Sequence, residues 1–172
     1  MHVSPVLLRH HAPLAQVRGA YNAIQVVGDA VGDTLYYGAG AGQMPTASAV
    51  VADLIDLAVG RAQPTFRTLA LGASQADIAL RPSATVRTRF YLRLLVPDRP
   101  GILADIARIL AAQDISISSV IQHEALEDRE GTTVPLVIMT HTALTGAFRT
   151  AVEQIDRSGK ITDPSVYYPV AD

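Results

Sequence analysis

The sequence Asp98-Arg99-Pro100-Gly101 joins a strand pattern to an amphipathic helix pattern, and its residue types can hold a small anion. Asp98 can cap the helix, and Pro100 suits the first helical position. Gly101 lets a ligand approach the backbone, at a helix end where unpaired N–H groups and the helix dipole favour negative charge. The turn therefore predicts a site for the carboxylate of a free amino acid.

A second candidate site is the glycine-rich sequence Gly38-Ala39-Gly40-Ala41-Gly42, which precedes another helix pattern. Such a loop can hold a phosphate or a cofactor ring at a helix N-terminus. It is not the full dinucleotide-binding fingerprint, because Pro45 stands where the third glycine would fall and no acidic residue follows at the expected distance. On spacing alone, a tight strand-to-helix turn is the favoured interpretation.

The other polar residues do not form a pattern typical of catalysis or of metal binding. None of the histidines has a metal-ligand spacing with a second histidine or a carboxylate; they are His2, His10, His11, His123 and His141. Ser48 has no His/Asp setting, and the acidic residues between 124 and 130 are typical of a solvated hairpin loop. The sequence therefore predicts no catalytic residue and no metal ligand in this chain.

Composition excludes several classes of protein. The chain has 172 residues, 49% of them hydrophobic, which argues against disorder, and its net charge of −2 does not favour nucleic acid or an anionic membrane as a partner. There is no cysteine, which excludes disulfides and thiolate chemistry and is compatible with the cytoplasm. No apolar run reaches membrane-span length. We therefore expect a cytoplasmic globular protein that binds neither nucleic acid nor membrane.

The clearest periodic patterns lie in residues 89–172. Alternating apolar residues predict strands, and apolar residues at a period near 3.6 predict helices. The expected strands are 90–96, 115–121, 133–140 and 165–168, and the expected helices are 102–110 and 144–155. This β-α-β-β-α-β order is the ferredoxin-like unit, with two helices on one face of an antiparallel sheet. Pro135 favours an edge or a bulge for its strand, and the second face of the sheet is left for a partner copy or a neighbouring domain.

Residues 1–60 carry strand patterns followed by one helix. The strand candidates are 3–8, 17–27 and 34–37, and Pro5 suits a strand start or an edge. The helix pattern has Pro45 near its start and Gly60 just after its end. Residues 61–88 show no periodicity and are interpreted as a linker. Because a strand pattern begins almost at once, we expect the chain to be a piece of a longer protein.

The Asp98-x-Pro100-Gly101 turn, with a strand before its helix and Ile115-Ser116-Ile117 after it, resembles an ACT regulatory domain. Residues 1–60 resemble the closing part of the homoserine dehydrogenase catalytic region. The quoted motifs are Tyr21-Asn22-Ala23-Ile24, Gly28-Asp29, Gly32-Asp33, Tyr37-Gly38-Ala39-Gly40-Ala41-Gly42 and Pro45-Thr46-Ala47-Ser48-Ala49-Val50-Val51-Ala52-Asp53. The resemblance implies an α+β chain: catalytic segment 1–60, linker 61–88 and a ferredoxin-like ACT domain over 89–172.

This resemblance implies a parent enzyme that reduces aspartate semialdehyde to homoserine with NAD(P)H, on the route to threonine and methionine. The family's nucleotide-binding domain, catalytic lysine and substrate-binding acidic residues precede the matched region, so the chain alone is expected to be inactive. NADP or NAD would contact only the loop, at Gly38, Gly40, Ala41 and Gly42. One departure is Ala12-Pro13-Leu14, where the family often has His-Pro-Leu.

The resemblance also implies an effector site. ACT domains bind a small amino acid between paired copies, near the first loop and the end of the second strand. Asp98 would meet the ammonium group, the N–H groups of Gly101 and Ile102 the carboxylate, and the amide of Gln122 can both donate and accept. The expected effector is threonine, as end-product feedback. Alternatively, Asp98 is only a helix cap and Gln122 only a polar residue at a strand end.

Three functions stay open on the sequence alone. The first is the C-terminal part of a homoserine dehydrogenase with a feedback domain. The second is a non-enzymatic ACT-type module that binds an amino acid and regulates another protein. In the third, the ACT domain only pairs subunits and binds no ligand. In each case the exposed sheet predicts self-association, as a homodimer or a tetramer.

Overall fold

The computed structural model describes residues 3–69, 79–122 and 133–171. The chain forms two compact units, Arg9–Ala79 and a second unit that combines Met1–Leu8 with Leu80–Asp172. We call them the N-terminal unit and the ACT unit, and describe each by itself. The sequence interpretation divided the chain at residues 60 and 88, whereas here the first eight residues belong with the C-terminal part.

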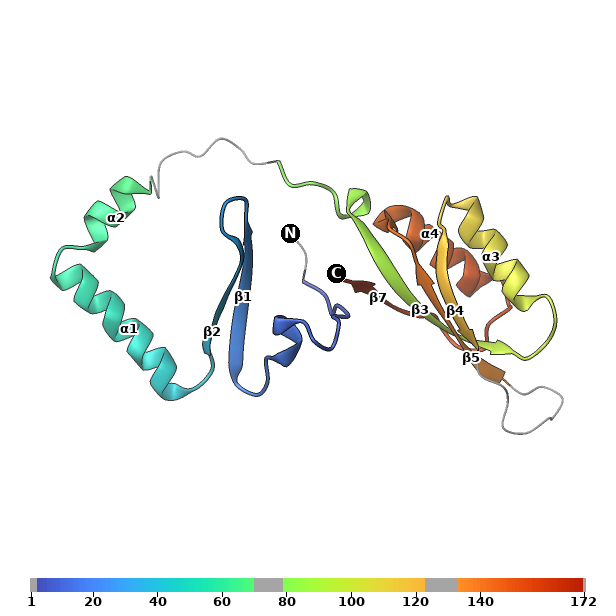
Figure 1. Cartoon of the computed structure of the whole chain (residues 1–172), viewed down its shortest axis with the longest axis horizontal. Coiled ribbons are helices and arrows are strands. Elements are labelled where there is room, and N and C mark those ends of the chain that lie inside the picture. The colour runs from blue at the N-terminus through green and yellow to red at the C-terminus, as the bar shows by residue number, and fades with distance from the viewer. Residues whose placement is uncertain (1–2, 70–78, 123–132, 172) are drawn as a thin grey trace. The chain divides into compact units, whose positions relative to one another are not determined.

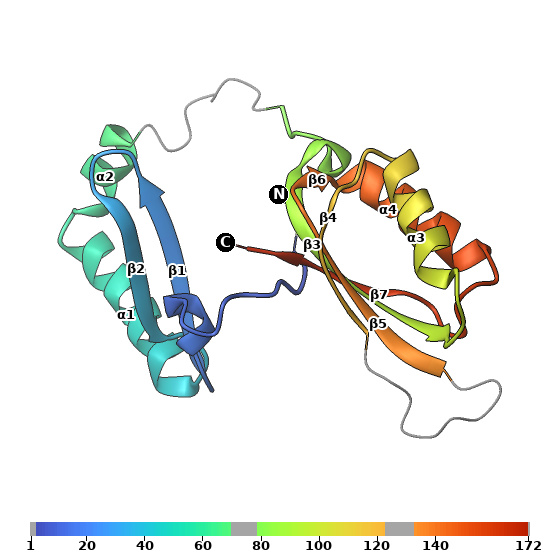
Figure 2. The same ribbon diagram turned by 45° about the vertical axis from the view of Figure 1, so that its right-hand side comes forward.

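The ACT unit is an antiparallel sheet with two helices on one face (Figures 1 and 2). Strand β3 lies between β5 and β7, and β4 pairs with the far side of β5. Its elements are β3 (Arg87–Pro97), α3 (Ile102–Ala112), β4 (Ile117–Gln122), β5 (Thr133–Thr140), the short β6 (Ala143–Leu144), α4 (Thr145–Arg157) and β7 (Val166–Val170). The predicted α+β class and β-α-β-β-α-β order are confirmed, with β6 as an addition beside the start of β3.

Alternation along β3 creates the core of this unit. Its inward side chains are all buried: Phe90, Leu92, Leu94 and Val96. From α4, Phe148 is fully buried and stacks on Phe90 with ring centroids 3.8 Å apart. The buried hydroxyl of Thr140 accepts a hydrogen bond of 3.0 Å from the Phe90 N–H, so this polar group is satisfied inside the core. The strand that carries the candidate effector turn is therefore firmly anchored.

Pro135 lies near the start of β5, one residue before the part of this strand that is paired with β4 in the described residues. β5 runs between β3 and β4, and Pro135 is paired with Leu95. The Leu95 carbonyl accepts a hydrogen bond from the Thr162 N–H, and therefore points away from β5. The pair accordingly exchanges no ladder hydrogen bonds, and the missing proline N–H costs none between β3 and β5.

The N-terminal unit contains a hairpin and two helices. β1 (Tyr21–Gly28) pairs with β2 (Gly32–Ala39), α1 (Gln43–Ala58) follows, and α2 (Ala62–Thr68) occupies the start of the predicted linker. The first strand begins later than expected because Gly19 has a φ of +64°. A 3-10 turn precedes it at Pro13–Gln16, and another lies in the ACT unit at Ser83–Thr85.

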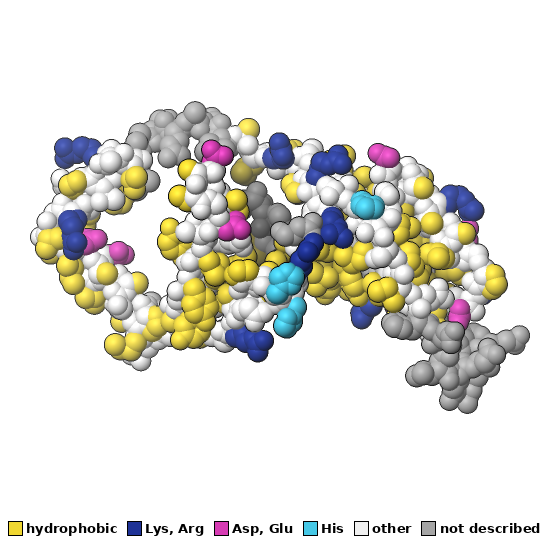
Figure 3. Space-filling model, viewed as in Figure 1, with side chains coloured by type: hydrophobic (Ala, Val, Ile, Leu, Met, Phe, Trp, Pro, Cys, Tyr) yellow, Lys and Arg dark blue, Asp and Glu magenta, His cyan; other side chains and the backbone are white. Residues whose placement is uncertain are grey.

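Apolar side chains of α1 are exposed, and Figure 3 shows them in yellow along this helix. Val50, Val51 and Leu54 keep 54%, 51% and 58% of their surface accessible. A 16-residue helix with an uncovered apolar stripe is typical of an element that packs against further protein. In the part of the chain that the structure describes, no helix is long and apolar enough to cross a membrane.

Candidate functional site

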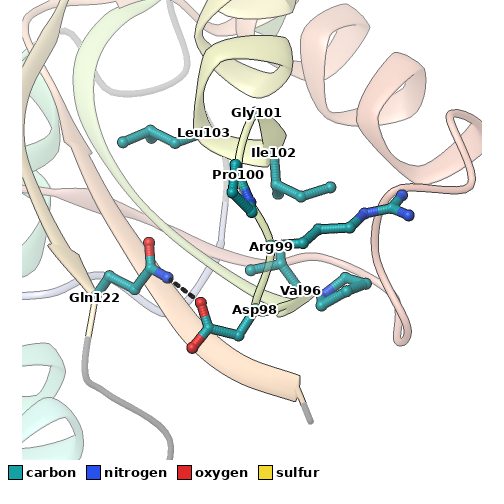
Figure 4. A pocket seen from close by; sticks show the side chains of 9 residues that line it. Val96, Asp98, Arg99, Pro100, Gly101, Ile102, Leu103 and Gln122 are labelled. Atoms are coloured by element: carbon teal, nitrogen blue, oxygen red, sulfur yellow. Dashed lines mark hydrogen bonds between the residues drawn. The ribbon is translucent and has the colours of Figure 1, made fainter. Parts of the chain in front are cut away.

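The candidate effector site is a cavity of about 420 Å³ between the β3–α3 turn and the end of β4 (Figure 4). Eight consecutive residues of the turn and the helix start line it, together with one residue of β4. These residues are Val96, Pro97, Asp98, Arg99, Pro100, Gly101, Ile102, Leu103 and Gln122. All four residues predicted to bind an effector therefore line one cavity.

The turn starts the helix differently from the prediction. Gly101 itself is the N-cap residue, with φ +93° and ψ −20°, and Asp98 makes no capping hydrogen bond. Pro100 lies before the helix, so it does not occupy the first helical position. The left-handed backbone at Gly101 disfavours any residue with a Cβ, which explains the glycine. The carboxylate of Asp98 is thus available for contacts other than capping.

The helix start presents unpaired donors at this cavity. The first hydrogen bond of α3 runs from the Asp105 N–H to the Gly101 carbonyl, at 3.0 Å. The N–H groups of the N-cap Gly101, of Ile102 and of Leu103 therefore have no partner within the helix. At an N-terminus with its positive partial charge, such donors suit a carboxylate or another anion.

Asp98 and Gln122 meet across the cavity mouth. The Gln122 Nε2 donates to the Asp98 Oδ1 at 3.3 Å, in an exposed position (Figure 4). The bond is long and open to water, so a ligand ammonium group can replace it at small cost. The fold thus brings the turn and the strand end together, as the prediction of a shared site requires.

Leu103 was not among the residues predicted from the sequence to bind the effector. Its side chain is 39% exposed and lines the cavity. Ile102, in contrast, buries its side chain almost completely, so it offers the site only its backbone. The Arg99 side chain extends away from Asp98 and Gln122 (Figure 4). Leu103 therefore supplies an apolar wall beside polar groups.

Asp105 fixes the first turns of α3 to the segment after α4. Its carboxylate accepts hydrogen bonds from Lys160 and, at 2.9 Å, from Arg108. These bonds, the Lys160 bond first, lower the pKa of Asp105 below its ordinary value of 3.8. Because both cations are engaged by Asp105, the helix start is held in place by an ion-pair cluster outside the cavity.

The glycine-rich segment is shaped by local packing. Gly38 and Ala39 belong to β2, so the loop proper is only residues 40–42. A Cβ at Gly40 would lie 1.6 Å from the Asn22 Nδ2, and Gly42 is the N-cap of α1 with φ +121°. The predicted cofactor contacts Gly38, Gly40, Ala41 and Gly42 are all exposed. An open backbone at a helix start fits contact with a dinucleotide, and Gly40 also has a purely structural reason to be glycine.

No described group of three or more His, Cys, Asp or Glu residues is arranged to hold a metal ion. The acidic segment 124–130, interpreted as a solvated loop, lies outside the residues that the structure describes.

Family profiles match both parts of the chain. The homoserine dehydrogenase profile matches residues 1–55, and the ACT domain profile matches residues 90–157. The chain matches the C-terminal part of bacterial homoserine dehydrogenases. The predicted resemblance is thereby confirmed, with the catalytic-region segment first and the ACT domain second.

Named relatives agree along nearly the whole chain. The homoserine dehydrogenase of Pseudomonas aeruginosa is 37% identical over 170 residues, and that of Neisseria gonorrhoeae is 38% identical over 168 residues. These alignments cover 96% and 95% of this chain, but only 39% and 38% of the relatives. The chain thus spans well under half the length of the homoserine dehydrogenases it matches.

Solved structures support the same assignment. A homoserine dehydrogenase from Thiobacillus denitrificans is 41% identical, with a TM-score of 0.82, and the match covers 98% of this chain and 38% of that one. A homoserine dehydrogenase from S. aureus is 27% identical, with a TM-score of 0.50 over 98% of this chain and 37% of that one.

Proposed function

We propose that the chain is the C-terminal part of an NAD(P)-dependent homoserine dehydrogenase, whose ACT unit binds threonine as a feedback effector. The observation that carries the proposal is the cavity at the start of α3. There Asp98, Gln122 and two unpaired backbone N–H groups converge beside the apolar Leu103. This set matches the carboxylate, ammonium group and short side chain of a small amino acid.

Each part of the ligand has a partner of suitable chemistry. The N–H groups of Gly101 and Ile102 take the carboxylate, since they lie at the positive end of α3. Asp98 takes the ammonium group as a charge-assisted hydrogen bond, replacing its bond to Gln122. Gln122 is then free to donate to, or accept from, the hydroxyl group of threonine. Leu103 contacts the methyl group.

The direct test is calorimetric titration of the purified chain with threonine, with serine, isoleucine and methionine as controls. Asp98→Asn keeps the shape of the side chain but removes its charge, and should weaken threonine binding at least tenfold. Asp163→Asn makes the same chemical change at an exposed site away from the cavity, and should leave binding unchanged. Absence of threonine binding in the folded chain would refute the effector assignment.

Self-association is the second part of the proposal. The outward face of the sheet carries half-buried apolar side chains with no covering helix, among them Tyr91, Leu95 and Met139. A homodimer or a tetramer would cover such a surface. Light scattering at tens of micromolar should give at least twice the mass of one chain, and a monomer would contradict this part.

The enzymatic activity belongs to the proposed parent protein. When bound, NADP or NAD would supply the hydride for the reduction of aspartate semialdehyde to homoserine. In this chain the exposed backbone of Gly38, Gly40, Ala41 and Gly42 would contact the dinucleotide. The isolated chain should show no homoserine-dependent reduction of NADP or NAD, and measurable turnover would refute this assignment.

A further inference from the structure

The beginning of the chain adds to the edge of a sheet formed at its other end. Leu7 makes a parallel bridge with Val170 of β7. The Leu7 N–H donates to the Pro169 carbonyl at 2.9 Å, and the Ala171 N–H donates to the Leu7 carbonyl at 3.0 Å. This contact lies within the ACT unit. The strand pattern predicted at residues 3–8 thus yields a single bridge.

Two prolines explain why the pairing does not continue toward the N-terminus. In a parallel ladder, the next pair of hydrogen bonds toward the N-terminus would need N–H donors from residue 5 and residue 169. Both residues are proline, so neither donor exists. The sequence therefore ends the ladder on the N-terminal side of Leu7, which remains 37% exposed.

Val170 of β7 has a pairing partner on each side. Arg89, near the start of β3, pairs with Val170 from the side opposite to Leu7. The chain leaves the ACT unit after Leu8 and returns to it at Leu80. Val170 is thus flanked by the segment that leads into Arg9–Ala79 and by the strand that follows it.

We infer that Pro5–Leu8 is an edge latch, which covers the open edge of β7 within the ACT unit and so prevents this edge from pairing with a second copy of the chain. With the latch closed, β7 has no free edge at Val170 for pairing with a second copy. Two hydrogen bonds and a half-exposed side chain make a contact that can open without unfolding the sheet.

Amide hydrogen exchange on the full chain tests the latch. Leu7→Pro removes the donor to Pro169 and should raise exchange of the Ala171 N–H at least tenfold. Leu8→Pro is the matched control, since the N–H of the next residue along an extended strand points away from β7. It should leave Ala171 protected. Equal exchange in wild type and Leu7→Pro would overturn the inference.

A truncated chain that begins at Arg9 removes the latch without introducing proline. It should show the same faster exchange at Ala171, while core amides such as that of Leu92 stay protected. Light scattering at tens of micromolar should give a larger mass for both latch variants than for the Leu8→Pro control. An unchanged mass would show that the latch does not block pairing at this edge.

Discussion

Substitution of Gly101 separates the backbone requirement of the turn from its role in binding. At φ +93° a residue with a Cβ costs about 1–2 kcal/mol. No heavy atom lies within 4 Å of the position that a Cβ would take, so Gly101→Ala adds this backbone strain but no steric clash. We therefore expect Gly101→Ala to destabilise the ACT unit by about 1–2 kcal/mol, which lowers the midpoint of thermal unfolding by about 4–8 °C for each kcal/mol.

Gly159 provides the matched control for this substitution. It lies after α4 with φ +66° and likewise has open space around the position of a Cβ. Gly159→Ala should cost similar stability, because the strain is of the same kind, yet it should leave threonine affinity unchanged. Gly101→Ala should in addition weaken threonine binding at least tenfold, since relaxing the strain moves the N–H groups of the helix start.

Urea unfolding followed by circular dichroism measures the stability of both variants, and calorimetric titration measures their affinity for threonine. Gly101→Ala with wild-type stability and wild-type affinity would refute the argument from backbone geometry. Equal loss of affinity in both variants would show that binding follows global stability and not the shape of the turn.

Three further predictions follow from packing and charge. Phe148→Ala should destabilise the ACT unit by about 3–5 kcal/mol in urea unfolding, whereas truncating the half-exposed Phe66 should cost under about 1 kcal/mol. The pKa of Asp105 is lowered in the folded chain. Its hydrogen-bonded carboxylate therefore adds to the free energy of unfolding above the pKa of the unfolded chain, and this contribution is lost as the pH falls through the folded pKa. Asp105→Asn should make the free energy of unfolding less dependent on pH below about pH 4. Gly40→Ala should cost about 1 kcal/mol, because its Cβ displaces the Asn22 side chain, and Asn22→Gly should restore the loss.

Hydrophobic periodicity and turn residues predicted most helices and strands, because the formation of these elements depends mainly on residues that are close in sequence. The alternation in β3 and the helical period in α4 specify which side chains face the core. The inward side chains of β3 are buried as expected, and so are Phe148, Ala151, Val152 and Ile155 of α4, whereas Leu144 at the start of the helical pattern is exposed. The effector turn was predicted for the same reason, since a glycine between a strand and a helix is a local signal. The capping role of Asp98 was wrong, because the N-cap position depends on the actual turn of the chain, which places Gly101 there.

The sequence by itself therefore determined the element order, the core faces and the need for glycine at residue 101. Tertiary structure decided which distant residues meet: Gln122 with Asp98, Leu103 with the cavity, and Leu7 with β7. It also decided that the pair of Pro135 and Leu95 exchanges no ladder hydrogen bonds, so the proline is tolerated beside β3. The physical reason is that hydrophobic periodicity and turn formation depend on residues that are close in sequence, whereas strand order and edge pairing depend on how the whole sheet assembles.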